Sequence, residues 1–316
     1  MRKPTRPSLI RPSTRTFLAA ARRTPGYSAF DWLHGYVYGR WIYLYIGLGT
    51  GGHPLASRLK RFALAAGRLR RSQPPADDEP VTTFADTYHG KVVTLEAAKQ
   101  LVRVERDVEL RDLEHVIPYA LARDIVLQNP DHIVALECPC RASRPNPCLP
   151  MDVCLIVGEP FASFALEHHR ARSRAISPAE AEQILGDEHA RGHVQHAFFK
   201  DAMLGRFYAI CNCCACCCGA LHAHHHGIPM LASSGYVAQV DAELCAACGA
   251  CANSCQFAAL SLNGDHAVVD MAACMGCGVC ISQCPQEAIS LRRDSSKGEP
   301  LEIQKLIAEA ATAGQY

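Results

Sequence analysis

Residues 245–255 read CAACGACANSC and residues 274–284 read CMGCGVCISQC, so one spacing of cysteines occurs twice near the C-terminal end of the chain. Both stretches follow the pattern Cys-x-x-Cys-x-x-Cys-x-x-x-Cys, and the second lies 29 positions after the first, which indicates an internal duplication. Gaps of two residues allow a tight loop to direct three thiolates at one metal centre. Zinc sites with four cysteines usually take them as two separated pairs, so a repeated three-plus-one spacing favours iron–sulfur clusters.

With its flanking residues, this duplicated segment, residues 236–293, resembles the two-cluster ferredoxins of bacteria. The resemblance implies two [4Fe–4S] clusters with crossed ligation, in which the fourth cysteine of each half binds the cluster of the other half. One cluster would then be held by Cys245, Cys248, Cys251 and Cys284, and the other by Cys274, Cys277, Cys280 and Cys255.

Two local features of this segment bear on its fold. Residues 260–262, Asn263-Gly264 and 267–269 are typical of a strand, a tight turn and a strand, which predicts a hairpin between the two cluster loops. Gln256 follows Cys255 where the family has proline, whereas Pro285 follows Cys284 as in the family. This departure affects a local turn and leaves the ligands in place.

The rest of the chain predicts an α+β protein of several domains. A length of 316 residues is enough for two or three of them. We expect a basic, partly disordered N-terminal arm and docking region over residues 1–80, a cysteine-rich α+β domain over 81–235, the ferredoxin-like module over 236–293, and a C-terminal helix or tail over 294–316. Residues 1–16 hold three prolines and no apolar period, which predicts extended or disordered chain.

Cysteine use indicates a reducing compartment. All eighteen cysteines lie between Cys138 and Cys284. Iron–sulfur ligands must be thiolates, and no secretory signal is recognised at the start of the chain, so disulfides are not expected. We therefore predict a cytoplasmic protein, either free or peripheral on the inner face of a membrane.

Positive charge is concentrated at the N-terminal end. Residues 1–71 contain fourteen of the 32 Lys and Arg residues but only one of the 31 acidic residues, Asp31. An acidic partner surface, an anionic membrane face or nucleic acid would each attract such a segment, unless it is merely a solvated arm. Nucleic acid is disfavoured because no finger, helix-turn-helix or RNA-binding signature accompanies the charge. The expected partners are a redox protein or larger oxidoreductase complex, with peripheral membrane association through residues 1–71.

Residues 30–48, FDWLHGYVYGRWIYLYIGL, are apolar and aromatic, but they are too few to span a membrane and Arg40 interrupts them. Such a segment suits an interfacial anchor or a docking surface, or it forms a strand and a short helix packed on the next domain. The glycines at 47, 49 and 52 imitate a dinucleotide-binding fingerprint. No second strand with an acidic residue follows at the required distance, so a glycine turn before a basic helix over 54–69 is the better interpretation.

The middle domain shows mixed helix and strand signals. Residues 94–104, 118–127 and 178–191 predict helices, the second ended by Asn129-Pro130 and the third capped by Ser177. Residues 133–136, 193–199 and 206–210 predict strands. The third helix and the hairpin after it resemble a winged-helix element. Three histidines fall in this region, and we expect them to be hydrogen-bonded or exposed rather than metal ligands: His189, His193 and His196.

The first cysteine motif of this domain is ECPCRASRPNPCLPMDVC, residues 137–154. A proline-stiffened loop with four cysteines is typical of a closed metal site; they are Cys138, Cys140, Cys148 and Cys154. A third [4Fe–4S] cluster is the first interpretation, a zinc ion the second, and ligands shared with the next motif the third. Arg141 and Arg144 lie beside these thiolates, where their charges would raise the potential of a cluster unless they are solvated.

The second motif is CNCCACCCG, residues 211–219, and histidines follow at 222 and 224–226. Its six cysteines are Cys211, Cys213, Cys214, Cys216, Cys217 and Cys218. Adjacent side chains on a regular element cannot all face one ion, so an irregular loop must direct some of these thiols elsewhere. They would bind another cubane, complete the site begun by Cys138 and Cys140, hold a larger cluster, or include spare redox-active thiols. A Cys-x-Cys-Arg loop and an Ile-Cys-Asn-Cys-Cys segment before a ferredoxin repeat resemble the arrangement in a group of poorly characterised bacterial iron–sulfur proteins.

Cluster chemistry is the only chemistry that the sequence indicates, since no hydrolase elbow, phosphate loop or paired carboxylate motif is present. The leading hypothesis is an electron-transfer protein or subunit that relays single electrons to or from a partner oxidoreductase, rather than a stand-alone enzyme. One alternative is a reductase with a non-standard or site-differentiated iron–sulfur cluster in the middle domain. The other is a metal-binding interaction module without a redox function.

Overall fold

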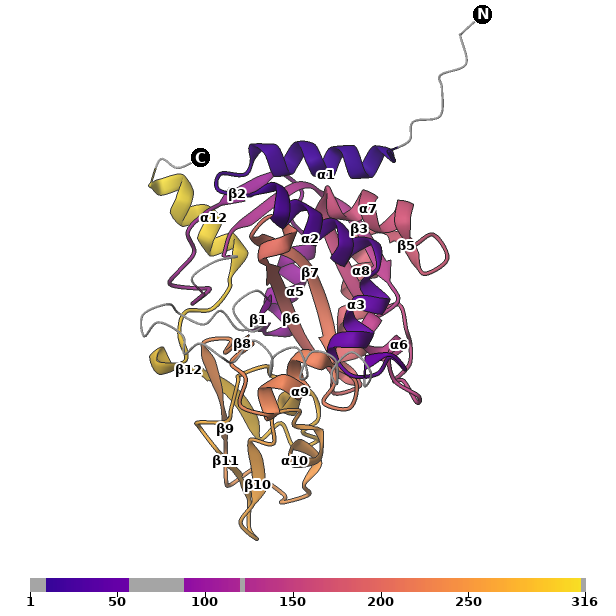
Figure 1. Ribbon diagram of the computed structural model, residues 1–316. Coiled ribbons are helices and arrows are strands. Elements are labelled where there is room, and N and C mark those ends of the chain that lie inside the picture. Colours follow the sequence, from indigo (N-terminus) through magenta and orange to yellow (C-terminus); the bar gives the residue numbers. More distant parts are fainter. Residues whose placement is uncertain (1–9, 57–87, 120–122, 314–316) are drawn as a thin grey trace, which may run out of the picture.

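The computed structural model describes residues 10–56, 88–119 and 123–313. Within these ranges the chain forms a large domain of sheet and helices and a smaller module, which lies at its lower end in Figure 1. The chain contains both helices and strands, and its main sheet is largely antiparallel, which fits the α+β class. Most of the helix predicted over 54–69, and the first residues of the N-terminal arm, fall outside the described residues.

An eight-stranded sheet forms the centre of the large domain. Its strands follow the order β2-β3-β4-β7-β6-β1-β8, and β5 pairs with β3. Neighbouring strands are antiparallel except β1 and β8, which are parallel. The strands are β1 (Tyr88–Val93), β2 (Val108–Leu110), β3 (Ile125–Leu136), β4 (Cys154–Glu159), β5 (Ser173–Ile176), β6 (Val194–Lys200), β7 (Arg206–Cys213) and β8 (Leu231–Ala232). The predicted hairpin of β6 and β7 is present, but it lies in the middle of this sheet and is fully buried along β6, so it is not the wing of a winged helix.

Helices cover both faces of the sheet, and each face has its own apolar core. On one face, α5 (Leu95–Val102), α8 (Pro178–Ala190) and α12 (Ile303–Thr312) pack against side chains such as Leu155 and Phe199. On the other, α1 (Pro12–Arg23), α2 (Ala29–Arg40), α3 (Ile42–Gly49) and α7 (Phe161–His168) pack with Ile156 and Phe198. Neighbouring residues of β4 and β6 thus point to opposite faces, as strand geometry requires.

Two of the three predicted helices of this domain form where their capping residues lie. The Thr94 hydroxyl accepts a hydrogen bond from the Ala97 amide and begins α5, and the Ser177 hydroxyl accepts one from the Glu180 amide and begins α8. Each cap satisfies a backbone donor that the first turn of a helix leaves unpaired.

The prediction of a helix over residues 118–127 is wrong. Ile125 already begins β3, and this strand continues through Asn129-Pro130 instead of ending before it. Asn129 has a positive φ of 51°, and the pairing with β4 shifts register between Gln128 and Ile133. The Asn-Pro pair therefore forms an irregularity within the strand, because proline removes one backbone donor but is compatible with extended chain.

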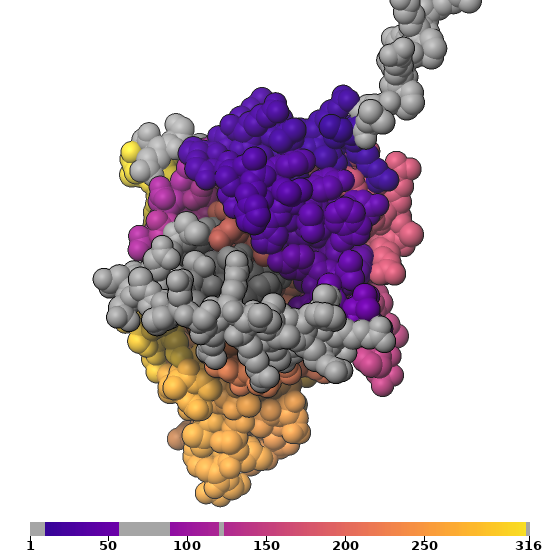
Figure 2. Space-filling view, viewed as in Figure 1, coloured from indigo at the N-terminus to yellow at the C-terminus, as the bar shows by residue number. Residues whose placement is uncertain are grey.

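The N-terminal segment is helical and packs on the large domain. α1 begins at Pro12, so residues 12–16 are not extended as predicted, and the aromatic segment forms α2 and α3 rather than a strand and a helix. Proline suits the first turn of a helix because its missing N–H would be unpaired there. Tyr38 Oη lies 2.8 Å from Tyr208 Oη on β7, and Tyr43 Oη donates to the Glu137 carbonyl oxygen at 2.9 Å. Figure 2 shows these helices, in indigo, over the upper part of the large domain.

Part of the apolar surface of α2 and α3 faces outward. Phe30 is 76% exposed, and Leu33, Trp41 and Leu44 are exposed as well. In the part of the chain that the structure describes, no helix has the length and apolarity needed to cross a bilayer.

The glycine pattern after the aromatic segment has a packing role. Gly47 lies inside α3, so no strand leads into the pattern as a dinucleotide site would require. A Cβ on Gly52 would lie 2.2 Å from the Ser143 carbonyl oxygen. The turn after α3 therefore packs directly on the first cysteine loop, which includes the short helix α6 (Pro139–Ala142).

The smaller module consists of two strand pairs and two short helices. β9 (Tyr236–Val240) pairs with β12 (Ile289–Arg293), and β10 (Leu260–Leu262) pairs with β11 (Ala267–Val269) as the predicted hairpin. α10 (Ala250–Ser254) and α11 (Val279–Ser282) each begin within a cysteine stretch. After β12 the chain returns to the large domain, where Leu306 and Ile307 of α12 join the core.

Candidate metal centres

The eight cysteines of the smaller module lie in two sets, and each set mixes the two halves of the repeat. Cys245, Cys248, Cys251 and Cys284 line one hollow beside the β10–β11 hairpin. Cys255 lies near Cys274, Cys277 and Cys280. Burial raises the pKa of the Cys280 thiol to about 12, and the neighbouring charges of Cys274 and Cys255 raise it as well. The charges of Cys255 and Cys274 act on Cys277 in the same direction. The fourth cysteine of each half thus lies beside the first three of the other half.

Backbone amides point at four of these sulfur atoms. Ala259 N donates to Cys255 Sγ and Ala288 N to Cys284 Sγ, both at 3.3 Å, while Ala267 N donates to Cys245 Sγ and Ala238 N to Cys274 Sγ, both at 3.4 Å. Amide donors stabilise a thiolate relative to a thiol, and they tune the potential of a bound cluster. The donors and the arrangement of thiols therefore fit iron–sulfur ligation.

The family model for a 4Fe-4S dicluster domain matches residues 237–294, a segment that includes all eight of these cysteines. The C-terminal module is an iron–sulfur domain of the ferredoxin type. We refer to it as the ferredoxin module. The match begins after the ten upstream cysteines, so it does not describe them. No curated protein matches the chain.

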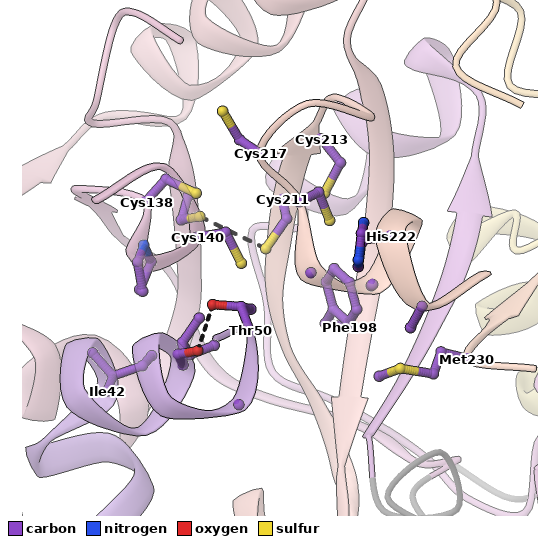
Figure 3. A pocket seen from close by; sticks show the side chains of 18 of the residues that line it. Ile42, Thr50, Cys138, Cys140, Phe198, Cys211, Cys213, Cys217, His222 and Met230 are labelled. Carbon is purple, nitrogen blue, oxygen red and sulfur yellow. Dashed lines mark hydrogen bonds between the residues drawn. The ribbon is translucent and has the colours of Figure 1, made fainter. Parts of the chain in front are cut away.

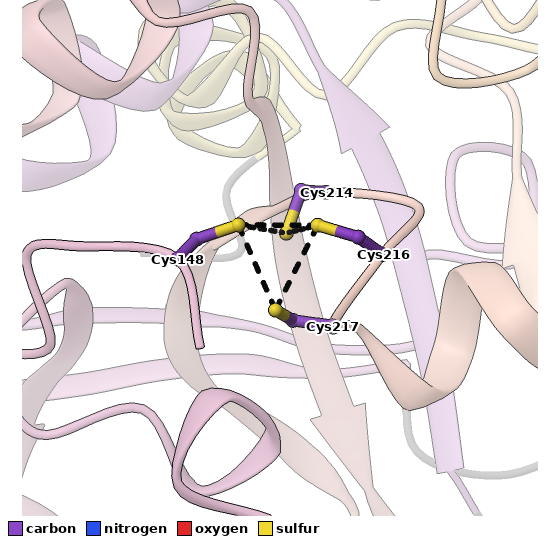
Figure 4. A group of neighbouring side chains, drawn as sticks. All are labelled: Cys148, Cys214, Cys216 and Cys217. Carbon is purple, nitrogen blue, oxygen red and sulfur yellow. Dashed lines mark hydrogen bonds between the residues drawn. The ribbon is translucent and has the colours of Figure 1, made fainter. Parts of the chain in front are cut away.

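The ten upstream cysteines also fall into two groups, but the division does not follow the two sequence motifs. The sulfur atoms of one group lie within 4.8 Å of one another (Figure 4), and we name this group the tetrathiolate site; it consists of Cys148, Cys214, Cys216 and Cys217. The other six line a large cavity, which we name the six-cysteine cavity; they are Cys138, Cys140, Cys154, Cys211, Cys213 and Cys218. Cys214 and Cys217 of the tetrathiolate site also border this cavity, so the two sites adjoin.

Within the described residues, the thiols of the loop 138–154 are divided between the two groups, and the third cluster that was the first interpretation stays a prediction. Cys154 begins β4, and the pairing of β4 with β7 places it opposite Cys211, with the two sulfurs 3.7 Å apart. Cys148, earlier in the loop, contacts the turn after β7 instead. Thiols of the two motifs lie together because the strand pairing brings the motifs together.

The six-cysteine cavity has a volume of about 1170 Å³. Its walls come from α3 and the turn after it, the first cysteine loop, β7 and α9 (Gly219–His225), as Figure 3 shows. The thiols are neighbours: Cys138 interacts with Cys140 and Cys154, and Cys218 interacts with Cys140 and Cys213. Six thiols exceed the four that a cubane requires, so the donor set fits either a cubane with two further thiols or a larger cluster.

A buried ion pair lies behind this cavity. Arg141 and Glu188 form a salt bridge in which each side chain is 1% exposed, and His193 Nδ1 lies 2.7 Å from the same carboxylate. Hydrogen bonds from Cys140 and Cys154 lower the pKa of the Cys138 thiol, and the backbone amide and charge of Arg141 lower it further. Arg141 is thus not a solvated loop residue, and its charge favours a thiolate in the cavity.

Three other cavity residues could not be recognised from local sequence: Tyr38, Lys200 and Tyr208. They come from α2, β6 and β7, so only the fold brings them together. Burial lowers the pKa of Lys200 to about 8, and its ammonium lies 4.9 Å from the centre of the Tyr38 ring. The one available signal was a lysine at the end of an otherwise apolar strand, VQHAFFK.

The histidines outside the cavity are mainly structural. His189 Nδ1 lies 2.8 Å from Gln195 Oε1, and His193 contacts Glu188, so both have the hydrogen-bond partners that we expected. The expectation is wrong for His196, which is fully buried in β6 and whose two ring nitrogens have no hydrogen-bond partner among the described residues, because the apolar packing of β6 surrounds them. Of the histidine run after the second motif, His222 lines the cavity, whereas His225 faces the ferredoxin module.

Gln256 joins the ferredoxin module to the large domain. Its side-chain oxygen accepts a hydrogen bond from the Ala215 amide at 2.7 Å, and its side-chain nitrogen donates to the Gly192 carbonyl oxygen at 2.9 Å. His225 Nε2, on α9, lies 2.9 Å from the Gln256 carbonyl oxygen. The glutamine that replaces the family proline is therefore an interface residue. The set of thiols that includes Cys255 is next to the large domain, while the β10–β11 hairpin lies toward the far end of the module (Figure 1).

Proposed function

We propose that this protein is an iron–sulfur electron carrier, in which two [4Fe–4S] clusters of the ferredoxin module relay single electrons between an external redox partner and a metal centre in the six-cysteine cavity. The observation that carries the proposal is the succession of three groups of thiols. The set with Cys245 lies at the hairpin, the set with Cys255 lies at the interface, and the six-cysteine cavity lies behind α9.

The two crossed sets support the proposal of two clusters. Cys245, Cys248, Cys251 and Cys284 would hold one, and Cys274, Cys277, Cys280 and Cys255 the other. A bound [4Fe–4S] cluster supplies one-electron redox chemistry. The chain supplies the thiolates, the amide hydrogen bonds to sulfur and the packing that separates the clusters from water.

The position of α9 supports a connection between the module and the cavity. His222 on this helix lines the cavity, and His224 packs against Phe257 of the ferredoxin module with ring centroids 5.6 Å apart. Phe257 follows Cys255 by two residues. A short route of packed and hydrogen-bonded groups therefore leads from a proposed cluster ligand to the wall of the cavity.

The hairpin end of the module is the proposed docking surface for the redox partner. Cys248 is exposed there, and Leu244 and Leu262 are 55% and 43% exposed. Exposed apolar side chains beside a cluster ligand suit a small, transient electron-transfer contact.

The outer face of α2 and α3 is the proposed docking surface for an anionic membrane. Its exposed side chains include Phe30, Leu33 and Trp41, and Arg40 lies over the Trp41 ring at 5.5 Å. Aromatic and basic side chains together favour the interface between lipid headgroups and acyl chains. The excess of basic residues over residues 1–71 adds attraction to anionic lipid.

Iron and acid-labile sulfide, measured per chain in protein purified without oxygen, test the electron-carrier proposal. Loading of the ferredoxin module alone gives about eight of each, and a further cubane in the cavity gives about twelve. Chemical reduction should produce one-electron EPR signals, which Cys277→Ser should diminish and the neighbouring Ser282→Ala should not. A chain without iron and sulfide, or a metal content that Cys277→Ser leaves unchanged, would overturn the proposal.

The cavity favours one second candidate function, a reductase whose substrate binds at a cluster in the six-cysteine cavity. A volume of about 1170 Å³ is more than most small-molecule sites need. Lys200 and Tyr208 add polar groups to the thiols, and a lysine with a pKa of about 8 can donate a proton near neutral pH. Spectra of the reduced protein that change on addition of small oxidants, with turnover by the isolated chain, would favour this function over a pure relay.

A further inference from the structure

The tetrathiolate site brings four sulfur atoms together from two loops. Cys148 lies in the proline-rich loop before β4, and the other three lie in the turn that follows β7. The separations between Sγ atoms are 3.1 Å for Cys148 and Cys216, 3.2 Å for Cys214 and Cys216, 3.6 Å for Cys148 and Cys214, and 3.7 Å for Cys217 with Cys148 and with Cys216. Figure 4 shows the four side chains converging on one small space.

These separations suit one metal ion rather than a cluster. With metal–sulfur bonds of about 2.3 Å, the edges of a tetrahedron of thiolates are about 3.8 Å long. A cubane holds its four thiolates on four different irons at its outer corners, so they stand farther apart than around a single ion. A disulfide between Cys148 and Cys216 would need a separation of about 2 Å, well below the observed 3.1 Å.

The turn after β7 explains how neighbouring cysteines reach different sites. The amides of Cys217 and Cys218 both donate to the Cys214 carbonyl oxygen, at 3.3 and 3.0 Å. This closed turn allows the adjacent side chains of Cys216 and Cys217 to face the same point, which a strand would prevent. Cys213 and Cys218, on either side of the turn, line the six-cysteine cavity and are not part of the tetrathiolate site, whereas Cys214 and Cys217 also border that cavity.

The surroundings also suit a bound ion. Four thiolates outnumber the charges of a divalent ion, so the complex is anionic and positive neighbours stabilise it. Arg144 Nε donates to the Cys217 carbonyl oxygen at 3.2 Å, and the charge of Arg141 interacts with Cys214. Cys214 and Cys217 are buried while Cys216 is exposed, so the site is sheltered but can be loaded from solvent.

We infer that Cys148, Cys214, Cys216 and Cys217 bind one thiophilic divalent ion, Zn²⁺ or Fe²⁺, at a site separate from the clusters of the ferredoxin module and the cavity. Four tetrahedral thiolates are ligands that both ions accept. The ion links the Cys148 loop to the turn after β7, and Ala215 of that turn is hydrogen-bonded to Gln256. The site thereby holds the surface on which the ferredoxin module docks.

Cys148→Ser tests this inference through the ratio of metal to sulfide, because a mononuclear site contains no inorganic sulfide. We expect the anaerobically purified variant to lose about one metal ion per chain and no sulfide. Cys248→Ser, at an exposed thiol of the ferredoxin module, is the matched control and should lose iron and sulfide in equal numbers. A parallel loss of iron and sulfide in Cys148→Ser would overturn the inference.

A measurement on the unaltered protein covers the case in which Cys148→Ser does not fold. Metal analysis should find about one ion beyond the sulfide-matched iron. If that ion is zinc, X-ray absorption at the zinc edge should give four sulfur neighbours at about 2.3 Å and no nearby metal. If it is iron, Mössbauer spectra should contain one tetrathiolate iron apart from the clusters. Absence of any such ion, or a disulfide at Cys148, would refute the inference even where the electron-carrier proposal holds.

Discussion

Gln256→Pro restores the residue that the ferredoxin family has after the fourth cysteine, and we expect it to loosen the docking of the ferredoxin module without affecting its metal content. The backbone accommodates proline, because Cys255 has φ −71° and ψ 108°, a conformation that suits the residue before proline. Within the described residues the Gln256 amide donates no hydrogen bond, so proline removes none there. What is lost is the side chain and its two hydrogen bonds to Ala215 and Gly192.

The expected size of the effect follows from those two bonds. A hydrogen bond contributes roughly 1 kcal/mol net, so docking should weaken by about 2 kcal/mol, which is about 30-fold in the equilibrium between docked and undocked states. Hydrogen exchange at the Ala215 amide reports this directly, since the amide donates to Gln256, and its exchange should accelerate by a similar factor.

Gln286→Ala is the control for this experiment. Gln286 is an exposed glutamine one residue after Pro285, which is the position equivalent to Gln256 in the second half of the repeat, and its replacement should leave exchange at Ala215 unchanged. Iron and sulfide should be the same in both variants and in the unaltered chain. Unchanged exchange at Ala215 in Gln256→Pro, or a loss of iron, would refute the interface role assigned to Gln256.

Three further predictions concern buried charge and the outer surface. Glu188→Gln leaves the charge of Arg141 buried without its partner, so the free energy of unfolding by denaturant should fall by about 3–5 kcal/mol. The control Glu182→Gln, at the more exposed pair with Arg103, should lower it by about 1 kcal/mol or less. Equal losses in the two variants would contradict the burial argument. Because burial lowers the pKa of Lys200 from 10.5 to about 8, the unfolded chain binds more protons than the folded chain between these values, so stability should rise with pH across this window. Lys200→Met should reduce that rise in denaturant midpoints measured from pH 8 to 10, and an unchanged slope would place Lys200 in water. Trp41→Ser should weaken sedimentation with vesicles that contain anionic lipid by roughly tenfold, while Leu149→Ser, at a more exposed apolar residue elsewhere, should not. Binding to a protein partner without vesicle binding would replace the membrane proposal.

The predictions from sequence that succeeded rest on local chemistry. The hairpin at residues 260–269 follows from Asn263-Gly264 between two apolar runs, and α5 and α8 follow from Thr94 and Ser177, whose hydroxyls cap the helices. In each case the residues that determine the element are a few positions apart. No distant part of the chain is needed to specify it.

The predictions that failed depended on partners elsewhere in the chain. The apolar pattern of residues 118–127 is compatible with a helix. The strand β3 begins at Ile125 instead, because this part of the chain pairs with β2 and β4. The aromatic segment was compatible with strand, but contacts of Tyr38 with Tyr208 and of Tyr43 with Glu137 accompany a helical form. Local propensity is weak compared with the burial that tertiary packing provides.

The sequence by itself determined the ferredoxin-type segment, because such a segment takes three of the four thiolates of each set from one short loop, and the spacing of cysteines in a short loop can be read directly from the sequence. The grouping of the ten upstream cysteines was decided only by the tertiary structure. The antiparallel pairing of β4 with β7 brings Cys154 beside Cys211, and the irregular turn after Cys213 directs adjacent thiols into two different sites. Sequence distance sets which thiols can share a loop, but strand register and turn conformation set which thiols face the same metal.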